Sequence, residues 1–233
     1  MLAVRNLNAY YGRAHILVDV SIEVASGEVV VLLGRNGAGK STTLKSIMGL
    51  VPPARGEIEF DGRRIDRREP YDIAAMGLGY VPEDRRIFTE LTVMENLEVG
   101  RQPVRAGAPA WTPARLFKLF PNLAEMTGRP GGRMSGGEQQ MLTIARTLMG
   151  NPSCILLDEP SEGLAPVIVD QMAAAIRSLK AEGLSVLLSE QNLHFAHEVS
   201  DRAYIIEKGH IRFAGTMSEL AANDDVRSQY LAV

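Results

Sequence analysis

A glycine-rich octapeptide restricts the possible folds of this chain more than any other part of its sequence. Residues 34–41 read Gly-Arg-Asn-Gly-Ala-Gly-Lys-Ser, which fits the pattern G-x-x-x-x-G-K-[ST]. An apolar run at 29–33 precedes it, and a helical pattern follows from about 40 to 48. Between a strand and a helix, such a loop turns main-chain amides inward around phosphate groups, and the helix N-terminus adds partial positive charge. The octapeptide therefore predicts a nucleotide site in an α/β fold.

Each part of this loop has an expected role in holding phosphates. Lys40 would reach the β- and γ-phosphates, and the Ser41 hydroxyl would bind Mg²⁺. An accidental glycine loop is the alternative, but at ordinary glycine usage it would arise in roughly 1% of chains of this length. The loop predicts nucleotide binding without telling which kind of nucleotide hydrolase carries it. The expected nucleotide-binding residues of this segment are Gly34, Arg35, Asn36, Gly37, Ala38, Gly39, Lys40, Ser41 and Thr42.

The remaining strand and helix patterns predict how the chain is organised. Short apolar runs indicate strands near residues 2–7, 16–24, 29–33, 57–60, 79–81, 154–157, 184–188 and 203–206. Amphipathic helices between the later runs favour a parallel sheet with crossover helices. About 120 residues separate the phosphate-loop strand from the strand near 154, and helical patterns fill most of that gap. We expect a single α/β domain over 1–233, with a P-loop NTPase core and a mainly parallel sheet (1–83 and 150–233), an N-terminal antiparallel β part and an inserted helical subdomain (84–149).

Two local signals add detail to this organisation. The strands near 57–60 and 79–81 are expected to flank the turn at Asp61. The stretch 101–113 is rich in Gly, Ala and Pro and is expected to be a surface loop. A helical pattern follows it and is interrupted at Pro121.

Composition limits where the chain works and what it contacts. Its formal net charge is −3, so nothing global favours nucleic acid as a partner. The longest apolar runs have about five residues, whereas a membrane span needs roughly 20, and the N-terminus does not read as a signal peptide. We therefore expect a cytoplasmic protein. The single cysteine, Cys154, lies in an apolar run and is expected to be a buried side chain rather than a reactive thiol.

An acidic pair follows a second apolar strand. Four apolar residues lead into Asp158-Glu159-Pro160, and an aspartate at the carboxyl end of a buried strand beside the phosphate loop is placed to bind Mg²⁺. On an extended chain Glu159 would point to the other side, where it could polarise an attacking water. Acidic residues that merely end a strand are the alternative, which the phosphate loop makes less favourable. We predict Asp158 as a metal ligand and Glu159 as the catalytic base.

Residues 134–140, Met-Ser-Gly-Gly-Glu-Gln-Gln, give the most specific signal. Ser135 and Glu138 have the spacing of a capping box that starts a helix, and the glycines between them leave an amide-lined anion site open. An ordinary capped helix would not need the paired glycines. The segment resembles the LSGGQ signature of ATP-binding-cassette (ABC) ATPases, in which two subunits pack head to tail and this motif closes over the γ-phosphate held by the partner. The resemblance implies ATP contacts for Ser135, Gly136, Gly137 and Glu138.

The resemblance covers nearly the whole chain, and it implies roles for four further residues. Tyr11 would stack on adenine, with Tyr10 as the less favoured neighbour and a core position as the alternative. Glu83 stands where the family has a glutamine, and it would bind Mg²⁺ and couple to the membrane subunits. Gln191 stands where most members have a histidine, so its amide would contact the γ-phosphate in a catalytic role but could not carry a proton. Ala165 replaces the usual aspartate of the loop that follows the acidic pair.

Together these departures resemble the smaller ATP-binding subunit of branched-chain amino acid importers. The segments that carry the resemblance are 81–83, 135–140, 163–166, 190–192 and 226–231. It implies ATP hydrolysis with Mg²⁺, coupled to transport from the inner face of the plasma membrane. It also implies a second ABC subunit of the same or a different kind, membrane permease subunits and, indirectly, a periplasmic substrate-binding protein. Importers of urea or short amides are close relatives, so the transported substrate stays open.

Three other interpretations remain. Non-transport ABC ATPases that act on ribosomes or chromosomes usually carry two cassettes or a long coiled-coil insertion, and the sequence shows neither. A GTPase switch would need an Asn-Lys-x-Asp tetrapeptide, which the sequence lacks, and would leave the paired glycines unused. A weakly hydrolysing regulatory subunit stays open because Glu83, Ala165 and Gln191 replace the usual residues.

Overall fold

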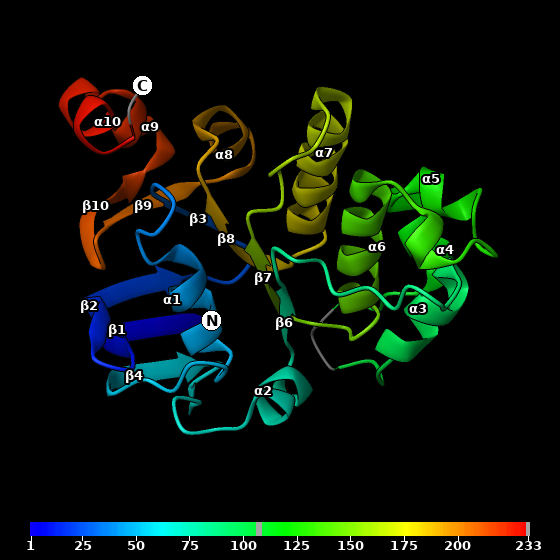
Figure 1. Cartoon of the computed structure of the whole chain (residues 1–233), viewed down its shortest axis with the longest axis horizontal. Coiled ribbons are helices and arrows are strands. Elements are labelled where there is room, and N and C mark those ends of the chain that lie inside the picture. Colours follow the sequence, from blue (N-terminus) through cyan, green and yellow to red (C-terminus); the bar gives the residue numbers. More distant parts are fainter. Residues whose placement is uncertain (106–108, 232–233) are drawn as a thin grey trace.

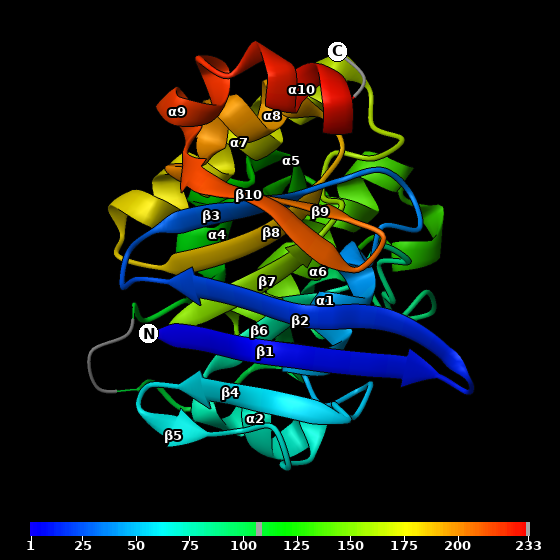
Figure 2. The ribbon, with the colours of Figure 1, turned by 90° about the vertical axis from the view of Figure 1, so that its left-hand side faces the viewer.

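The computed structural model describes residues 1–105 and 109–231, whose strands form two sheets. A six-stranded sheet has the order β10-β9-β3-β8-β7-β6, and an antiparallel four-stranded sheet has the order β2-β1-β4-β5. In the larger sheet only β10 pairs antiparallel with its neighbour. Figure 2 looks onto the smaller sheet, where β2, β1, β4 and β5 follow one another downwards. The predicted fold class, including the N-terminal antiparallel part, is confirmed.

The elements have the following bounds. The strands are β1 (Leu2–Tyr11), β2 (Ala14–Val24), β3 (Val29–Leu33), β4 (Arg55–Phe60), β5 (Arg63–Arg64), β6 (Leu78–Val81), β7 (Cys154–Asp158), β8 (Ser185–Glu190), β9 (Arg202–Glu207) and β10 (His210–Thr216). The helices are α1 (Lys40–Ile47), α2 (Pro70–Met76), α3 (Val93–Gly100), α4 (Pro113–Leu119), α5 (Pro121–Ala124), α6 (Gly136–Leu148), α7 (Pro166–Ala181), α8 (Leu193–Val199), α9 (Met217–Ala221) and α10 (Asp224–Tyr230), with a 3₁₀ turn at Gly131–Arg133.

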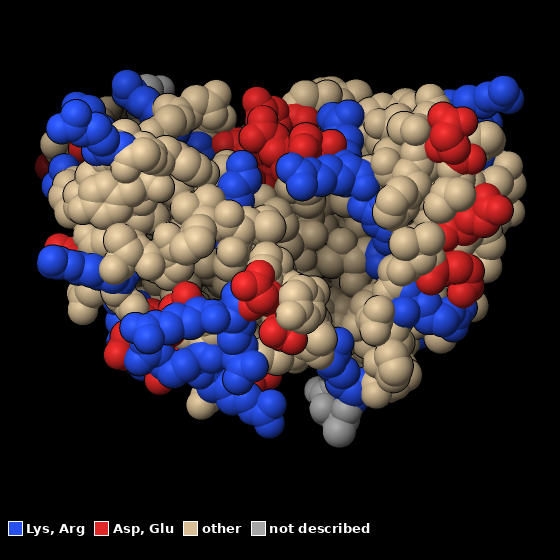
Figure 3. All heavy atoms as spheres, turned by 60° about the horizontal axis from the view of Figure 1, so that its bottom comes forward, with Lys and Arg blue, Asp and Glu red and all other residues tan. Residues whose placement is uncertain are grey.

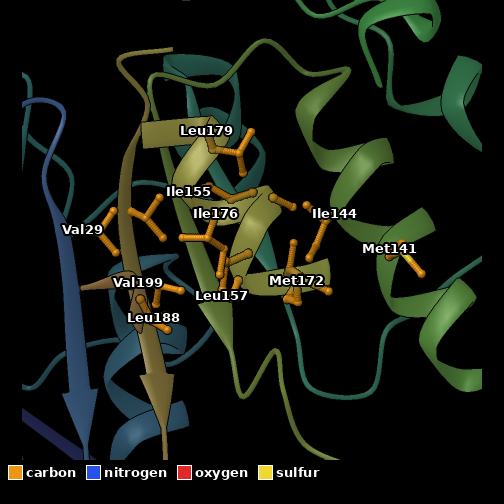
Figure 4. Packing of buried hydrophobic residues seen from close by; sticks show 14 of the residues in the cluster. Val29, Met141, Ile144, Ile155, Leu157, Met172, Ile176, Leu179, Leu188 and Val199 are labelled. Carbon is orange, nitrogen blue, oxygen red and sulfur yellow. The ribbon is translucent and has the colours of Figure 1, made fainter. Parts of the chain in front are cut away.

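The central strands are buried on both faces, which explains their continuous apolar sequence. All five residues of β3 and of β7 are buried. On one face, side chains such as Leu157 and Leu188 pack against α7, and α6 lies beside that helix (Figure 4). The opposite face packs on α1 and the antiparallel sheet in a second core. Two cores thus hold the carboxyl ends of β3, β8 and β7 in fixed positions along one edge.

Cys154, the first residue of β7, has no exposed surface. Burial raises the pKa of its thiol to about 12, so the thiolate that reacts with oxidants or metals is suppressed at neutral pH. The expectation of a buried, unreactive cysteine is confirmed.

The chain between β6 and β7 is helical in its described part. It contains α3 to α6, which lie together on the right in Figure 1, beside β6 and β7. Thr92 starts α3 with a capping box, because its hydroxyl accepts the N–H of Glu95 while the Glu95 carboxylate accepts the N–H of Thr92. The predicted interruption near Pro121 is confirmed, since α4 ends at Leu119 and α5 begins at Pro121.

Two local expectations were wrong. The turn at Asp61 joins β4 to β5, whereas β6 lies in the other sheet and is reached through α2. Strand pairing is decided by contacts between distant segments, so the local pattern could not assign the partner. The stretch 101–113 is not wholly at the surface, because Trp111 is buried and its main-chain N–H donates to Asn151 Oδ1 at 2.7 Å. Residues 106–108 of that stretch lie outside the described residues.

No helix in the described part of the chain has both the length and the apolar character needed to cross a membrane.

Candidate functional site

The phosphate loop leaves β3 and ends at the first residue of α1. Gly34 has no room for a side chain, because a Cβ there would lie 2.4 Å from the carbonyl oxygen of Ile206. Gly39 has a φ of 115°, which L-residues rarely adopt. Among the described residues no side chain caps α1. The main-chain N–H groups of its first turn are therefore available to phosphate oxygens, and phosphate binding by this loop stays a prediction.

Lys40 is buried at the start of α1, and its ammonium group has three partners. Its Nζ donates to the carbonyl oxygens of Gly34 at 2.6 Å and Arg35 at 3.1 Å. It also forms an ion pair with Glu159 Oε1 at 2.9 Å, and the two side chains are 3% and 5% exposed. A phosphate entering the loop would replace Glu159 as the counter-charge of Lys40.

Asp158 receives hydrogen bonds from three elements. Its Oδ1 accepts the hydroxyls of Ser41 at 2.9 Å and Ser189 at 2.7 Å, and its Oδ2 accepts the Tyr80 hydroxyl at 3.2 Å. Burial and the nearby charge of Asp158 raise the pKa of Tyr80, so this hydroxyl stays a donor. The carboxylate and the Ser41 hydroxyl are oxygen donors of the kind Mg²⁺ prefers, with phosphates and waters completing its shell. The donor set fits the predicted metal, although in the described residues no three or more His, Cys, Asp or Glu side chains form a metal-binding group by themselves.

Glu159 has a different backbone geometry from the one expected. The prediction of an extended chain was wrong, because β7 ends at Asp158 and Glu159 has a φ of 50°. A non-glycine residue in this left-handed region is strained by roughly 1 kcal/mol or more, and such residues are frequent at active sites. Ser189 holds the turn, since both its carbonyl oxygen and its Oγ lie 3.1 Å from the donating N–H of Glu159. The turn directs the carboxylate towards Lys40 and Gln191.

Gln191 links the phosphate loop to the acidic pair. Its Nε2 donates to Asn36 Oδ1 at 2.8 Å and to Glu159 Oε2 at 3.2 Å. The strands that carry these residues, β3, β8 and β7, are adjacent and parallel, so their carboxyl ends meet at one edge of the sheet. The structure therefore brings together six predicted residues: Asn36, Lys40, Ser41, Asp158, Glu159 and Gln191.

The glycine pair at the start of α6 lies apart from this cluster. Ser135 and Glu138 form the predicted capping box, in which the Ser135 N–H donates to the Glu138 carboxylate at 2.6 Å. No hydrogen bond or ion pair among the described residues joins 135–138 to the phosphate loop. Figure 1 shows α6 and α1 on opposite sides of β7. Within one chain, the two predicted anion sites are therefore separate from each other.

Glu83 lies in a cavity of about 250 Å³ that also reaches Asp158. The lining residues are Lys45, Leu50, Tyr80, Pro82, Glu83, Asp84, Arg86 and Asp158. Figure 3 views the molecule from below Figure 1, where the surface is hollowed near its middle and both acidic and basic side chains surround the hollow. Glu83 thus lines the same cavity as the predicted metal ligand Asp158.

Tyr11 ends β1 and is half exposed, so the core alternative is excluded. Tyr10 stacks on His15 instead, with ring centroids 4.2 Å apart and planes inclined by 9°. An exposed aromatic ring is free to stack on a base, so the role of Tyr11 stays a prediction.

We expect Tyr11→Ala to weaken ATP binding roughly 5- to 150-fold, because stacking contributes about 1–3 kcal/mol per base. Tyr11→Phe should keep the affinity within about twofold, since the ring and not the hydroxyl stacks. Titration of the purified chain with a fluorescent ATP analogue measures both values. Equal affinity of Tyr11→Ala and wild type would assign adenine to another surface, and Tyr10→Ala is the matched control.

Sequence reasoning missed three polar residues of this site: Tyr80, Ser189 and Glu190. Ser189 lies opposite Asp158 in the register of β7 and β8. Ser189 and Glu190 are the two residues before Gln191, but their contacts depend on how β8 aligns with β7 and β3, which no local pattern contains. Tyr80 required the pairing of β6 with β7, which no local pattern contains.

Comparison with known proteins supports a family assignment. A family model described as "ABC transporter" matches residues 17–162. The chain belongs to the ABC transporter family. This cassette is an ATP-binding ATPase domain, as the sequence predicted.

Two curated relatives and one solved structure match this ABC cassette over nearly its whole length. BraG of Pseudomonas aeruginosa, a high-affinity branched-chain amino acid transport ATP-binding protein, is 43% identical over 231 residues, which is 99% of each chain. LptB of Haemophilus influenzae, a lipopolysaccharide export system ATP-binding protein, is 36% identical over 233 residues, covering 99% of this chain and 97% of LptB. The structure of MJ1267, an ATP-binding cassette of an ABC transporter, is 28% identical with a TM-score of 0.84, covering 100% of this chain and 97% of MJ1267.

Proposed function

We propose that this cassette powers an importer of branched-chain or other amino acids and hydrolyses ATP as one half of a two-subunit sandwich. One observation supports the two-subunit arrangement. Lys40, Ser41, Asp158, Glu159 and Gln191 form one connected cluster, while Ser135 stands elsewhere on the chain. A second cassette, placed head to tail, would bring its Ser135 helix to the phosphates held here. Similarity to BraG, whose name gives branched-chain amino acid transport, supports the importer.

In this mechanism the bound triphosphate rearranges the cluster. The loop amides and Lys40 hold the β- and γ-phosphates, and Lys40 exchanges its ion pair with Glu159 for one with phosphate. Glu159 then accepts the proton of a water whose oxygen attacks the γ-phosphorus as the bond to the β–γ bridging oxygen breaks. Gln191 donates its amide N–H to the γ-phosphate. Mg²⁺, held by Ser41 and Asp158 with Glu83 on the same cavity, would neutralise phosphate charge.

The partners follow from the same arrangement. The helical subdomain 84–149 presents Ser135 to the second subunit, and the loop that begins at Glu83 contacts the permease. ATP binding closes the two cassettes, hydrolysis reopens them, and Glu83 passes the motion to the permease. The cassette therefore works as a peripheral protein on the inner face of the membrane, and a periplasmic binding protein delivers the substrate.

A second candidate is an export system, which the 36% identity to LptB favours. The experiment that separates the two is purification of the tagged chain from detergent-solubilised membranes of the source organism, followed by identification of the bound proteins. We expect a second cassette and permease subunits among the bound proteins. We also expect deletion of the gene to abolish leucine uptake, and the wild-type gene to restore it. Lipopolysaccharide export subunits in the purified complex, with normal uptake in the deletion strain, would assign the cassette to export instead. If the wild-type gene restores uptake of urea or short amides to the deletion strain, and leucine uptake does not depend on the gene, the substrate class is urea or amides.

A further inference from the structure

Glu190 is a buried carboxylate whose role the mechanism above does not use. It ends β8, between β3 and β7, and its residue surface is 1% exposed. Its Oε1 accepts the N–H of Ser161 at 3.0 Å, and its Oε2 accepts the N–H groups of Gln191 at 3.1 Å and Asn192 at 3.2 Å. A buried carboxylate is costly unless hydrogen bonds satisfy it, and here three main-chain donors do so.

The donors come from the two segments that carry the catalytic side chains. Ser161 lies two residues after Glu159, so Glu190 holds the backbone just beyond the strained turn, while Ser189 holds the N–H of Glu159 itself. The other two donors are Gln191 and the residue that follows it. The main-chain carbonyl of Glu190 also accepts the N–H of Gly34 at 3.3 Å. One residue therefore contacts the acidic turn, the Gln191 segment and the phosphate loop.

We propose that Glu190 is a positioning residue for hydrolysis, which fixes the backbone of Gln191 relative to that of Glu159. The distance that it maintains is the one between Gln191 Nε2 and Glu159 Oε2, 3.2 Å in this structure. The inference rests on the proposed function, because it assigns Gln191 and Glu159 to the same reaction. Misplacing catalytic groups by about 1 Å can cost on the order of a hundredfold in rate.

A carboxylate is needed because acceptors are required at both ends of the side chain. A glutamine of the same size has one acceptor oxygen, and its NH₂ group would face an N–H donor at the other end. Glu190→Gln therefore removes the hydrogen bonding at one end of the side chain while the side-chain volume stays the same. Burial raises the pKa of Glu190, and the hydrogen bonds from Ser161 and Asn192 act against that shift.

The test measures ATP turnover of Glu190→Gln in the wild-type and Gln191→Ala backgrounds. We expect kcat to fall about tenfold or more with KM within about twofold, because ATP binding uses the phosphate loop and not this contact. In the Gln191→Ala background the same substitution should lower kcat less than about threefold, since there is no longer a Gln191 amide to position. Glu28→Gln is the matched control: Glu28 also accepts a main-chain N–H, but it lies before β3 at the opposite end of the sheet.

Equal losses of kcat in both backgrounds would overturn the proposal, and so would an unchanged kcat in Glu190→Gln. If Glu190→Gln does not fold, Glu190→Asp keeps both acceptor oxygens but shortens the side chain, and full activity of that variant would count against the proposal. Turnover of the wild-type protein distinguishes a failure of the proposed ATPase function from a failure of the role of Glu190. An inactive wild-type complex would remove the proposed function, whereas an active wild type with an equally active Glu190→Gln would remove only the role of Glu190.

Discussion

Replacing Lys40 with alanine is expected to lower ATP turnover by at least about a hundredfold, because the charge that stabilises the transferring phosphoryl group is lost. The structure adds a second consequence. Lys40 is the buried partner of Glu159, and both side chains are almost fully buried. Removing one partner of such a pair costs roughly 3–5 kcal/mol of folding stability, because a buried charge loses its counter-charge. Lys40→Ala should therefore be both inactive and less stable in urea unfolding.

A double variant separates these two effects. Glu159→Gln combined with Lys40→Ala removes the unpaired charge, so we expect most of the lost stability to return while turnover stays absent. Lys118→Ala, an exposed lysine of α4, is the matched control and should change neither property. Wild-type turnover in Lys40→Ala would remove Lys40 from the phosphate site. A double variant as unstable as Lys40→Ala would show that the ion pair is not the source of the stability loss.

The second large effect is expected for Glu159→Gln, which should hold the ATP-bound cassettes together. The amide cannot accept the proton of the attacking water, so turnover should fall about 100-fold or more. ATP then persists at the interface, and its contacts keep the subunits closed. The substitution also removes the ion pair between residue 159 and Lys40. The phosphates of ATP then no longer compete with a carboxylate for Lys40, so we expect tighter ATP binding.

Gel filtration with light scattering measures this second effect. The variant is mixed with whichever second cassette co-purifies with it, or kept alone if none does, in saturating ATP and Mg²⁺. We expect a stable dimer with ATP and separate subunits without it. Glu182→Gln, an exposed residue next to the C-terminal end of α7, should behave as wild type. Separate subunits in saturating ATP would contradict the head-to-tail sandwich, whatever the rate of hydrolysis.

The composition of the site could be predicted from sequence because its chemistry is concentrated in short contiguous motifs. A phosphate loop needs glycines, a lysine and a hydroxyl within eight positions, and a strand that ends in acidic residues follows a local pattern as well. Asp158 and Ser41 were assigned to one metal site from these patterns alone, and in the structure Ser41 Oγ donates to Asp158 Oδ1 at 2.9 Å. The role of Gln191 came from its place in a family motif rather than from the physics of the residue.

Local pattern failed wherever a contact joins distant segments. The direction of Glu159 was derived from strand alternation, but Ser189 holds its N–H and the backbone turns to a φ of 50°. The pairing of β4 with β5, and not with β6, depends on which strands meet in the folded chain. Glu190 gave no signal in the sequence because its donors are main-chain groups, which every residue possesses.

By itself, the sequence determined the kind of chemistry: phosphate binding by a glycine loop, an acidic pair and a separate glycine-marked helix start, on an α/β chain without a membrane-length apolar run. Those properties depend on residue type and short spacing, which are visible in one dimension. Only the tertiary structure decided that Lys40 pairs with Glu159, that Tyr80 and Ser189 support Asp158, and that Glu190 joins three segments. The reason is physical: these contacts exist because β3, β8 and β7 end side by side, and strand order is fixed by the packing of the whole sheet.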